Sequence, residues 1–138
     1  MTKKSDEKPR GTILLIEDEA MLVQIIQKKL KMNGFEVVSA TSGEQALDYL
    51  EDLTELPDAV WLDYYLGDMN GLDFLSKMKA SQKWKDVPVI VVSNSASDEK
   101  VHSMLALGAN KYVLKAEHRL DEIVDIFDQF VTDQSNKM

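Results

Sequence analysis

Five short apolar runs, each containing β-branched residues, recur along the chain, spaced roughly 23 to 29 residues apart. Between them, apolar residues return at helical intervals. Because each run is continuously apolar rather than alternating, we expect strands buried on both faces, as in a parallel sheet between helices with right-handed crossovers. The pattern predicts an open, doubly wound α/β domain. The predicted strands are Thr12–Ile16, Phe35–Ser39, Asp58–Leu62, Val87–Val92 and Lys111–Leu114.

Signals for helix ends fit this alternation. Gly34 and Gly108 stand just after the first and fourth helical patterns, where a left-handed residue commonly ends a helix. Ser42 and Gln45 have the spacing of a capping box at the start of the second helix.

The 138 residues are enough for one domain with one core. We expect that domain over residues 11–131. Residues 1–10 and 132–138 are polar and lack periodicity, which predicts a disordered N-terminal tail and a C-terminal tail.

Composition excludes several classes of function. The absence of cysteine removes disulfides, thiolate catalysis and cysteine-ligated metal centres. With a net charge of −8, the chain by itself lacks the electrostatic basis for binding nucleic acid or an anionic membrane. We find no apolar run long enough to span a bilayer, and the charged first ten residues do not resemble a secretory signal, so we expect a cytoplasmic protein.

Charged and polar side chains follow four of the predicted strands, at the sheet edge where open parallel sheets bind ligands. Glu17 and Asp18 follow the first strand and Asp63 the third, while Ser93 and Lys115 follow the fourth and fifth. Three carboxylates in one cleft repel each other unless a cation neutralises them. Oxygen ligands of this kind suit Mg²⁺, which keeps several waters and needs only one or two carboxylates.

Simpler interpretations exist for single residues. Asp18 or Glu19 alone could be a first-turn acid stabilised by the helix dipole, and a lysine after a strand is commonly just solvated. A nucleotide- or flavin-binding domain on this fold would need a glycine- or hydroxyl-rich first loop, and here that loop is acidic. An EF-hand is excluded because Gly71 follows Asp68 by three residues, not five.

The ordered set of strand ends resembles the receiver domains of response regulators in two-component phosphorelays. The resemblance covers residues 12–131 and rests on LLIEDE, WLDYYLGDMNG, VIVVSNSA and GANKYVLKA. The intervals carry its specificity: 45 residues from Asp18 to Asp63, 30 to Ser93, 19 to Tyr112 and 3 to Lys115. The resemblance implies a flavodoxin-like (βα)5 fold with strand order 2-1-3-4-5.

The resemblance also implies the roles of the site residues. Asp63 would accept a phosphoryl group from a histidine kinase or a histidine phosphotransfer protein. Glu17 and Asp18, with Asp63 and the main-chain carbonyl of Tyr65, would bind Mg²⁺, and Lys115 would contact the incoming phosphoryl group. These roles suit phosphoryl transfer to a carboxylate nucleophile, with the domain promoting its own phosphorylation and dephosphorylation.

Two further residues would form the switch. Ser93 would hold the transferred phosphoryl group and Tyr112 would turn inward, changing a partner-binding surface on the fourth helix, fifth strand and fifth helix. From the residues alone, Ser93 could equally be a helix cap, in competition with Ser95 and Ser97, and Tyr112 could simply pack on the last helix. The alternative to the whole assignment is a pseudo-receiver that binds partners without being phosphorylated. The kinase, the output target and any further domain stay open.

Three positions depart from the family pattern. Gly67 and Ala116 stand where the family usually has proline, and Asn94 stands where it usually has a small residue. Because a cis bond before a non-proline residue costs about 2.5–4 kcal/mol, we expect a trans Lys115–Ala116 peptide. His102 and His118 are expected at the surface.

Overall fold

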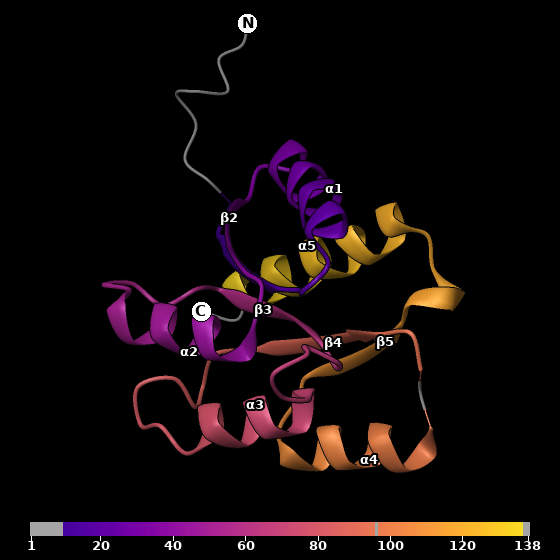
Figure 1. Cartoon of the computed structure of the whole chain (residues 1–138). Helices are drawn as coiled ribbons and strands as arrows, with labels where there is room; N and C mark the ends of the chain where they lie inside the picture. The colour runs from indigo at the N-terminus through magenta and orange to yellow at the C-terminus, as the bar shows by residue number, and fades with distance from the viewer. Residues whose placement is uncertain (1–9, 96, 137–138) are drawn as a thin grey trace, which may run out of the picture.

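The computed structural model describes residues 10–95 and 97–136. Five strands form one parallel sheet in the order β2-β1-β3-β4-β5, so the predicted fold class and strand order are confirmed (Figure 1). Each observed strand lies within two residues of its predicted bounds. The elements in chain order are β1 Thr12–Ile16, α1 Ala20–Met32, β2 Glu36–Ala40, α2 Gly43–Asp52, β3 Ala59–Asp63, α3 Gly71–Lys79, β4 Val89–Ser93, α4 Asp98–Leu107, β5 Lys111–Leu114, the 3-10 helix η2 Lys115–Glu117 and α5 Leu120–Asn136.

Helices cover both faces of the sheet (Figure 1). Alternate residues of β1 point to opposite cores: Ile13 and Leu15 pack with α1 and α5, whereas Leu14 and Ile16 pack with α2, α3 and α4. All four side chains are completely buried, as are most of those in β3 and β4. Burial on both faces is the reason that these strands are continuously apolar.

The structure corrects the predicted tails. α5 continues to Asn136, five residues past residue 131, because its polar end contains no glycine or proline and because Gln129 donates an i,i+4 hydrogen bond to Asp133 (3.0 Å). Arg10 belongs to the folded part, since its guanidinium donates to Asp128 (2.9 Å) and its amide to the Gly34 carbonyl (2.9 Å). The rest of the predicted N-terminal tail, residues 1–9, lies outside the described residues, as do 137–138.

The predicted glycine signals at the helix ends are confirmed, and the predicted capping box is formed in part. Gly34 and Gly108 follow α1 and α4 with φ values of 92° and 121°, the left-handed region that glycine favours. The Ser42 hydroxyl accepts from the Gln45 amide (3.0 Å), whereas the Gln45 side chain accepts from Thr41 rather than from Ser42. In the described part of the chain, we find no helix long and apolar enough to cross a membrane.

Candidate functional site

The carboxyl ends of the strands bring the predicted site residues together at one edge of the sheet. Oxygen atoms of Glu17, Asp18 and Asp63 all lie within 4.8 Å of one another. Glu17 is 1% exposed and Asp63 is 8% exposed, which is unusual for carboxylates. Asp18 is exposed, so the cluster opens to solvent on its side.

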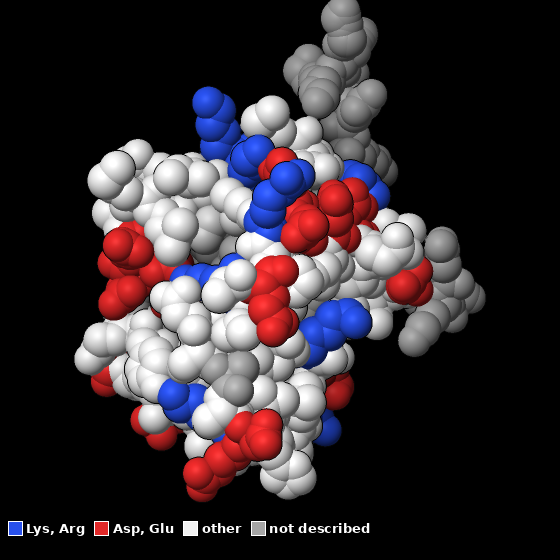
Figure 2. Space-filling view, turned by 90° about the vertical axis from the view of Figure 1, so that its right-hand side faces the viewer, with Lys and Arg blue, Asp and Glu red and all other residues white. Residues whose placement is uncertain are grey.

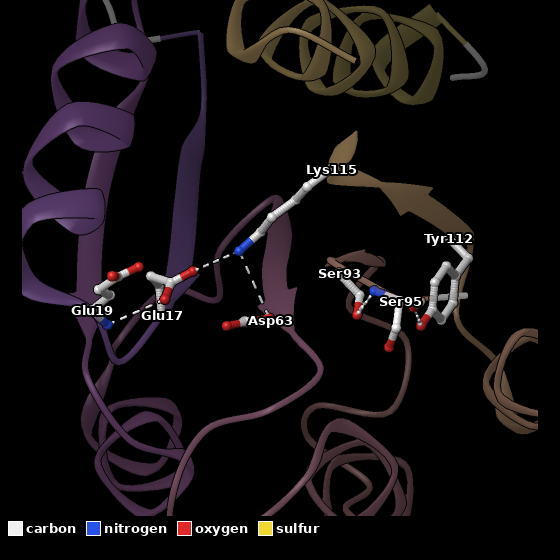
Figure 3. Close-up of polar contacts among 7 residues, drawn as sticks. All are labelled: Glu17, Glu19, Asp63, Ser93, Ser95, Tyr112 and Lys115. Atoms are coloured by element: carbon white, nitrogen blue, oxygen red, sulfur yellow. Dashed lines mark hydrogen bonds and ion pairs between the residues drawn. The ribbon is translucent and has the colours of Figure 1, made fainter. Parts of the chain in front are cut away.

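Lys115 lies between two of these carboxylates (Figure 3). Its Nζ donates to Glu17 Oε1 at 3.2 Å and stands 3.9 Å from Asp63 Oδ1. Glu17 also accepts from the Glu19 amide through its other oxygen (3.1 Å). The buried Glu17 carboxylate is therefore held by a cation and a main-chain N–H, which offset the cost of its burial.

Asp63 is the residue that this arrangement perturbs most clearly. Burial raises the pKa of Asp63 to about 7, with Lys115 opposing the shift and the neighbouring Glu17 and Asp18 carboxylates adding to it. A bound divalent cation would neutralise this crowded set and lower that pKa. The donor set, three carboxylates with one side open to water, fits Mg²⁺.

The simpler interpretation of Asp18 or Glu19 as a first-turn acid does not hold. α1 begins at Ala20 and its first turn contains no acidic residue, and the side chain of Glu19 at the N-cap makes no capping hydrogen bond within the described chain. The competing interpretation of Ser93 is likewise excluded, because Ser97 caps α4 by accepting from the Lys100 amide (3.2 Å). Ser93 instead ends β4, fully buried, with its Oγ accepting from the Ser95 amide (3.2 Å).

Tyr112 on β5 reaches the same loop. Its hydroxyl donates to the main-chain carbonyl of Ser95 (2.7 Å), so Ser95 connects Tyr112 to Ser93 (Figure 3). The ring of Tyr112 is only partly buried, against the α4 side of the sheet. The sequence correctly predicted Ser93 at the end of the fourth strand and Tyr112 on the fifth. It gave no indication that Ser95 links the two by hydrogen bonds.

The loop after Asp63 carries two features of its own. Gly67, at a family proline position, has a φ of 84°. Asp68 caps α2 from outside it, accepting from the amides of Gly43 and Glu44 (3.0 Å each), and these bonds lower the pKa of Asp68. This cap joins residues 25 positions apart, so helix-cap patterns in the sequence could not reveal it.

After β5, the 3-10 helix η2 contains Ala116, at the position where the family usually has proline. The Lys115–Ala116 peptide is trans, as predicted. Beside it lies a cavity of about 160 Å³ between α1 and α5, walled by Lys115 and Trp61 among mostly apolar side chains. His102 is exposed and His118 partly exposed, and neither belongs to the carboxylate cluster.

The face at this edge carries charges of both signs. Figure 2 looks onto it and shows acidic and basic side chains interspersed, with the carboxylates in several separate groups. The acidic side of α5 is partly neutralised within the chain: Asp121 pairs with Lys29 (2.5 Å) and Asp128 with Arg10. Two carboxylates of α5 are therefore neutralised by basic side chains from other parts of the chain.

A five-stranded sheet in this order, with carboxylates, a lysine and a hydroxyl at its carboxyl edge, defines a CheY-like α/β fold. Comparison with known families gives the assignment: residues 13–128 match the family model described as the response regulator receiver domain, and the chain belongs to that family. It is thus a receiver domain of the two-component response regulators.

Individual relatives agree. The chain is 38% identical over 106 residues to the alginate biosynthesis transcriptional regulatory protein AlgB of Pseudomonas aeruginosa, covering 77% of this chain and 23% of that protein. Among solved structures, it is similar to the phosphorylated cyanobacterial phytochrome response regulator RcpA, with a TM-score of 0.80, 27% identity and coverage of 90% and 95% of the two chains. The Mn²⁺-bound form of the response regulator Rcp1 matches with a TM-score of 0.77 and 25% identity, over 87% and 93%.

Proposed function

We propose that this receiver domain accepts a phosphoryl group on Asp63 in the presence of Mg²⁺. The observation that carries the proposal is the convergence of Glu17, Asp18 and Asp63 within 4.8 Å, with Lys115 against two of them. A pseudo-receiver would have no use for this costly cluster, in which two of the three carboxyl groups are buried. RcpA, a phosphorylated relative, and Rcp1, a Mn²⁺-bound one, support the same chemistry by analogy.

The proposed donor is a phosphohistidine of a histidine kinase or phosphotransfer protein. An Asp63 carboxylate oxygen attacks phosphorus, a P–O bond forms, and the P–N bond to the imidazole breaks. The electron pair stays on the imidazole nitrogen, which then takes up a proton. Little more than positioning and charge stabilisation is required of the protein.

Each side chain has a separate task in this reaction. Lys115, 3.9 Å from Asp63, offsets charge on the phosphoryl oxygens, and the Ser93 hydroxyl donates to one of them. Glu17, Asp18, Asp63 and the main-chain carbonyl of Tyr65 would hold Mg²⁺, which supplies further neutralisation of the phosphoryl charge when bound. Asp63 must be ionised to attack, and a neighbouring cation favours this form.

The proposed output is a change at α4, β5 and α5. Ser93, Ser95 and Tyr112 form one hydrogen-bonded chain from the phosphoacceptor edge to β5, so a phosphoryl group that engages Ser93 would displace the Ser95 loop and Tyr112 together. Beryllofluoride, an acyl-phosphate mimic, added with Mg²⁺ should shift amide signals over residues 93–115. Shifts confined to residues 20–55 would contradict this output route.

Labelling with acetyl phosphate tests the phosphoacceptor. With Mg²⁺, the intact chain should gain the mass of one phosphoryl group, and the gain should disappear in Asp63→Asn. Asp125→Asn, an exposed carboxylate on α5, is the matched control and should label as the wild type does. Undiminished labelling of Asp63→Asn, or labelling that is insensitive to chelation of Mg²⁺, would refute the proposal.

A further inference from the structure

Lys100, in the first turn of α4, connects the loop that follows β3 and Asp63 with the loop that follows β4. Its Nζ hydrogen-bonds to the Tyr65 hydroxyl, in the loop that follows β3. The same Nζ donates to Ser95 Oγ (3.2 Å), in the loop that follows β4, and lies 5.1 Å from the ring centroid of Tyr64. One ammonium group thus contacts both loops.

Helix stability does not account for a lysine at this place. Lys100 lies in the first turn of α4, after Asp98 and Glu99. Acidic residues there are stabilised by the positive end of the helix dipole, whereas a cation is disfavoured. The contacts to Tyr65 and Ser95 are therefore the interactions that its position favours.

Packing fixes the Tyr65 side chain only in part, through an edge-on contact with the ring of Tyr64 (centroids 4.9 Å apart). It is 53% exposed, while its neighbours Tyr64 and Leu66 are 7% and 2% exposed. An exposed side chain in a loop is ordinarily mobile. Bonding to Lys100 restrains the Tyr65 side chain, and with it the main chain whose carbonyl is a proposed Mg²⁺ ligand.

Ser95 links the loop that follows β4 to Lys100. Its amide donates to Ser93 Oγ and its carbonyl accepts from Tyr112, while its hydroxyl accepts from Lys100. Lys100 therefore acts on the segment that carries the proposed phosphoryl-binding hydroxyl as well as on the segment that carries the proposed metal-binding carbonyl.

We infer that Lys100 is a positioning residue, which holds Tyr65 and Ser95 so that the two loops beside Asp63 keep the geometry required for Mg²⁺. The inference rests on the proposed function. Tyr65→Phe isolates the effect, because it removes the hydroxyl and keeps both the ring and the main-chain carbonyl. Its loss of one hydrogen bond to a charged group should weaken Mg²⁺ binding by about 3- to 10-fold.

A double-mutant cycle separates this positioning from simple charge effects. Mg²⁺ affinity is measured on the full chain by titration of backbone amide signals for the wild type, Tyr65→Phe, Lys100→Met and the double variant. Removing the Lys100 charge alters the electrostatic attraction of Mg²⁺ equally with either residue at position 65. We therefore expect Tyr65→Phe to weaken binding in the wild-type background and to have no effect in the Lys100→Met background.

Two comparisons complete the test. Tyr49→Phe also removes a hydrogen-bonded hydroxyl, on α2, and should leave Mg²⁺ affinity unchanged. Lys100→Arg keeps the cation and its donors and should preserve the effect of Tyr65→Phe. If Tyr65→Phe weakens Mg²⁺ binding equally in both backgrounds, or does not weaken it at all, the positioning role of Lys100 is overturned. The proposed function would be unaffected by that result. Failure of the wild type to bind Mg²⁺ would overturn the proposed function and this inference with it.

Discussion

The raised pKa of Asp63 should make the free energy of unfolding depend on pH in a way that Asp63→Asn removes. In the metal-free folded protein this pKa is about 7, against an ordinary value of 3.8. Between these values the folded chain keeps a proton that the unfolded chain has released. The contribution of Asp63 to stability is thus fully present below the ordinary pKa and is lost as the pH rises to about 7.

The magnitude follows from the two pKa values. At about 1.36 kcal/mol per pKa unit, the full loss is roughly 4 kcal/mol. About a third of it has already occurred at pH 5, because the unfolded carboxyl is then mostly ionised. Between about pH 5 and pH 8, the wild type should therefore lose roughly 2–3 kcal/mol more stability than Asp63→Asn.

Urea unfolding in the presence of a chelator measures this difference. Both proteins carry the same other titrating groups, whose contributions largely cancel when the two pH dependences are subtracted. Asp125→Asn should follow the wild type, since that carboxylate is exposed. Parallel pH dependences for the wild type and Asp63→Asn would refute the argument that burial and neighbouring carboxylates hold Asp63 in its protonated form.

Three further predictions concern the metal and the loop after β3. Saturating Mg²⁺, at about 100 times its Kd, should stabilise the wild type by about 2.7 kcal/mol, and the rise in Tm should be lost in Asp18→Asn; an equal rise in that variant would exclude Asp18 as a ligand. Asp68→Ala should cost about 1 kcal/mol in urea unfolding through loss of the α2 cap, whereas Asp68→Asn should cost less. Gly67→Ala should cost about 1 kcal/mol because its φ is 84°, and an unchanged midpoint would show that the loop relaxes freely.

The sequence predicted the sheet well because its signal is local and strong. Runs such as Val89–Val92 in β4 are apolar at every position, and burial on both faces requires this. The bounds of β2, β3 and β4 differed from the prediction by one or two residues, and at β2 and β4 apolar residues lie just before the strand. The end of α5 was missed because polar residues support a helix through side-chain bonds that hydrophobic periodicity does not register.

Some parts of the candidate site could likewise be predicted from the sequence, and others could not. Glu17, Asp18, Asp63, Ser93 and Lys115 were predictable because each lies at or just after the end of a strand, and parallel topology brings strand ends together. The contacts of Asp68, Ser95 and Lys100 were not, because they join loops whose conformations depend on the completed fold. The first turn of α4 offered one clue, a lysine where the helix dipole favours an acid.

Trp61 gives the protein an optical reporter beside its site. It lies two residues before Asp63, 1% exposed, stacked on Phe127 at 4.8 Å, and shares a cavity with Lys115. Trp84, the second indole, lies before β4 at the far edge of the sheet. A Trp84→Phe variant would thus emit from Trp61 alone, and a displacement of Lys115 would be visible as a change in fluorescence without any label.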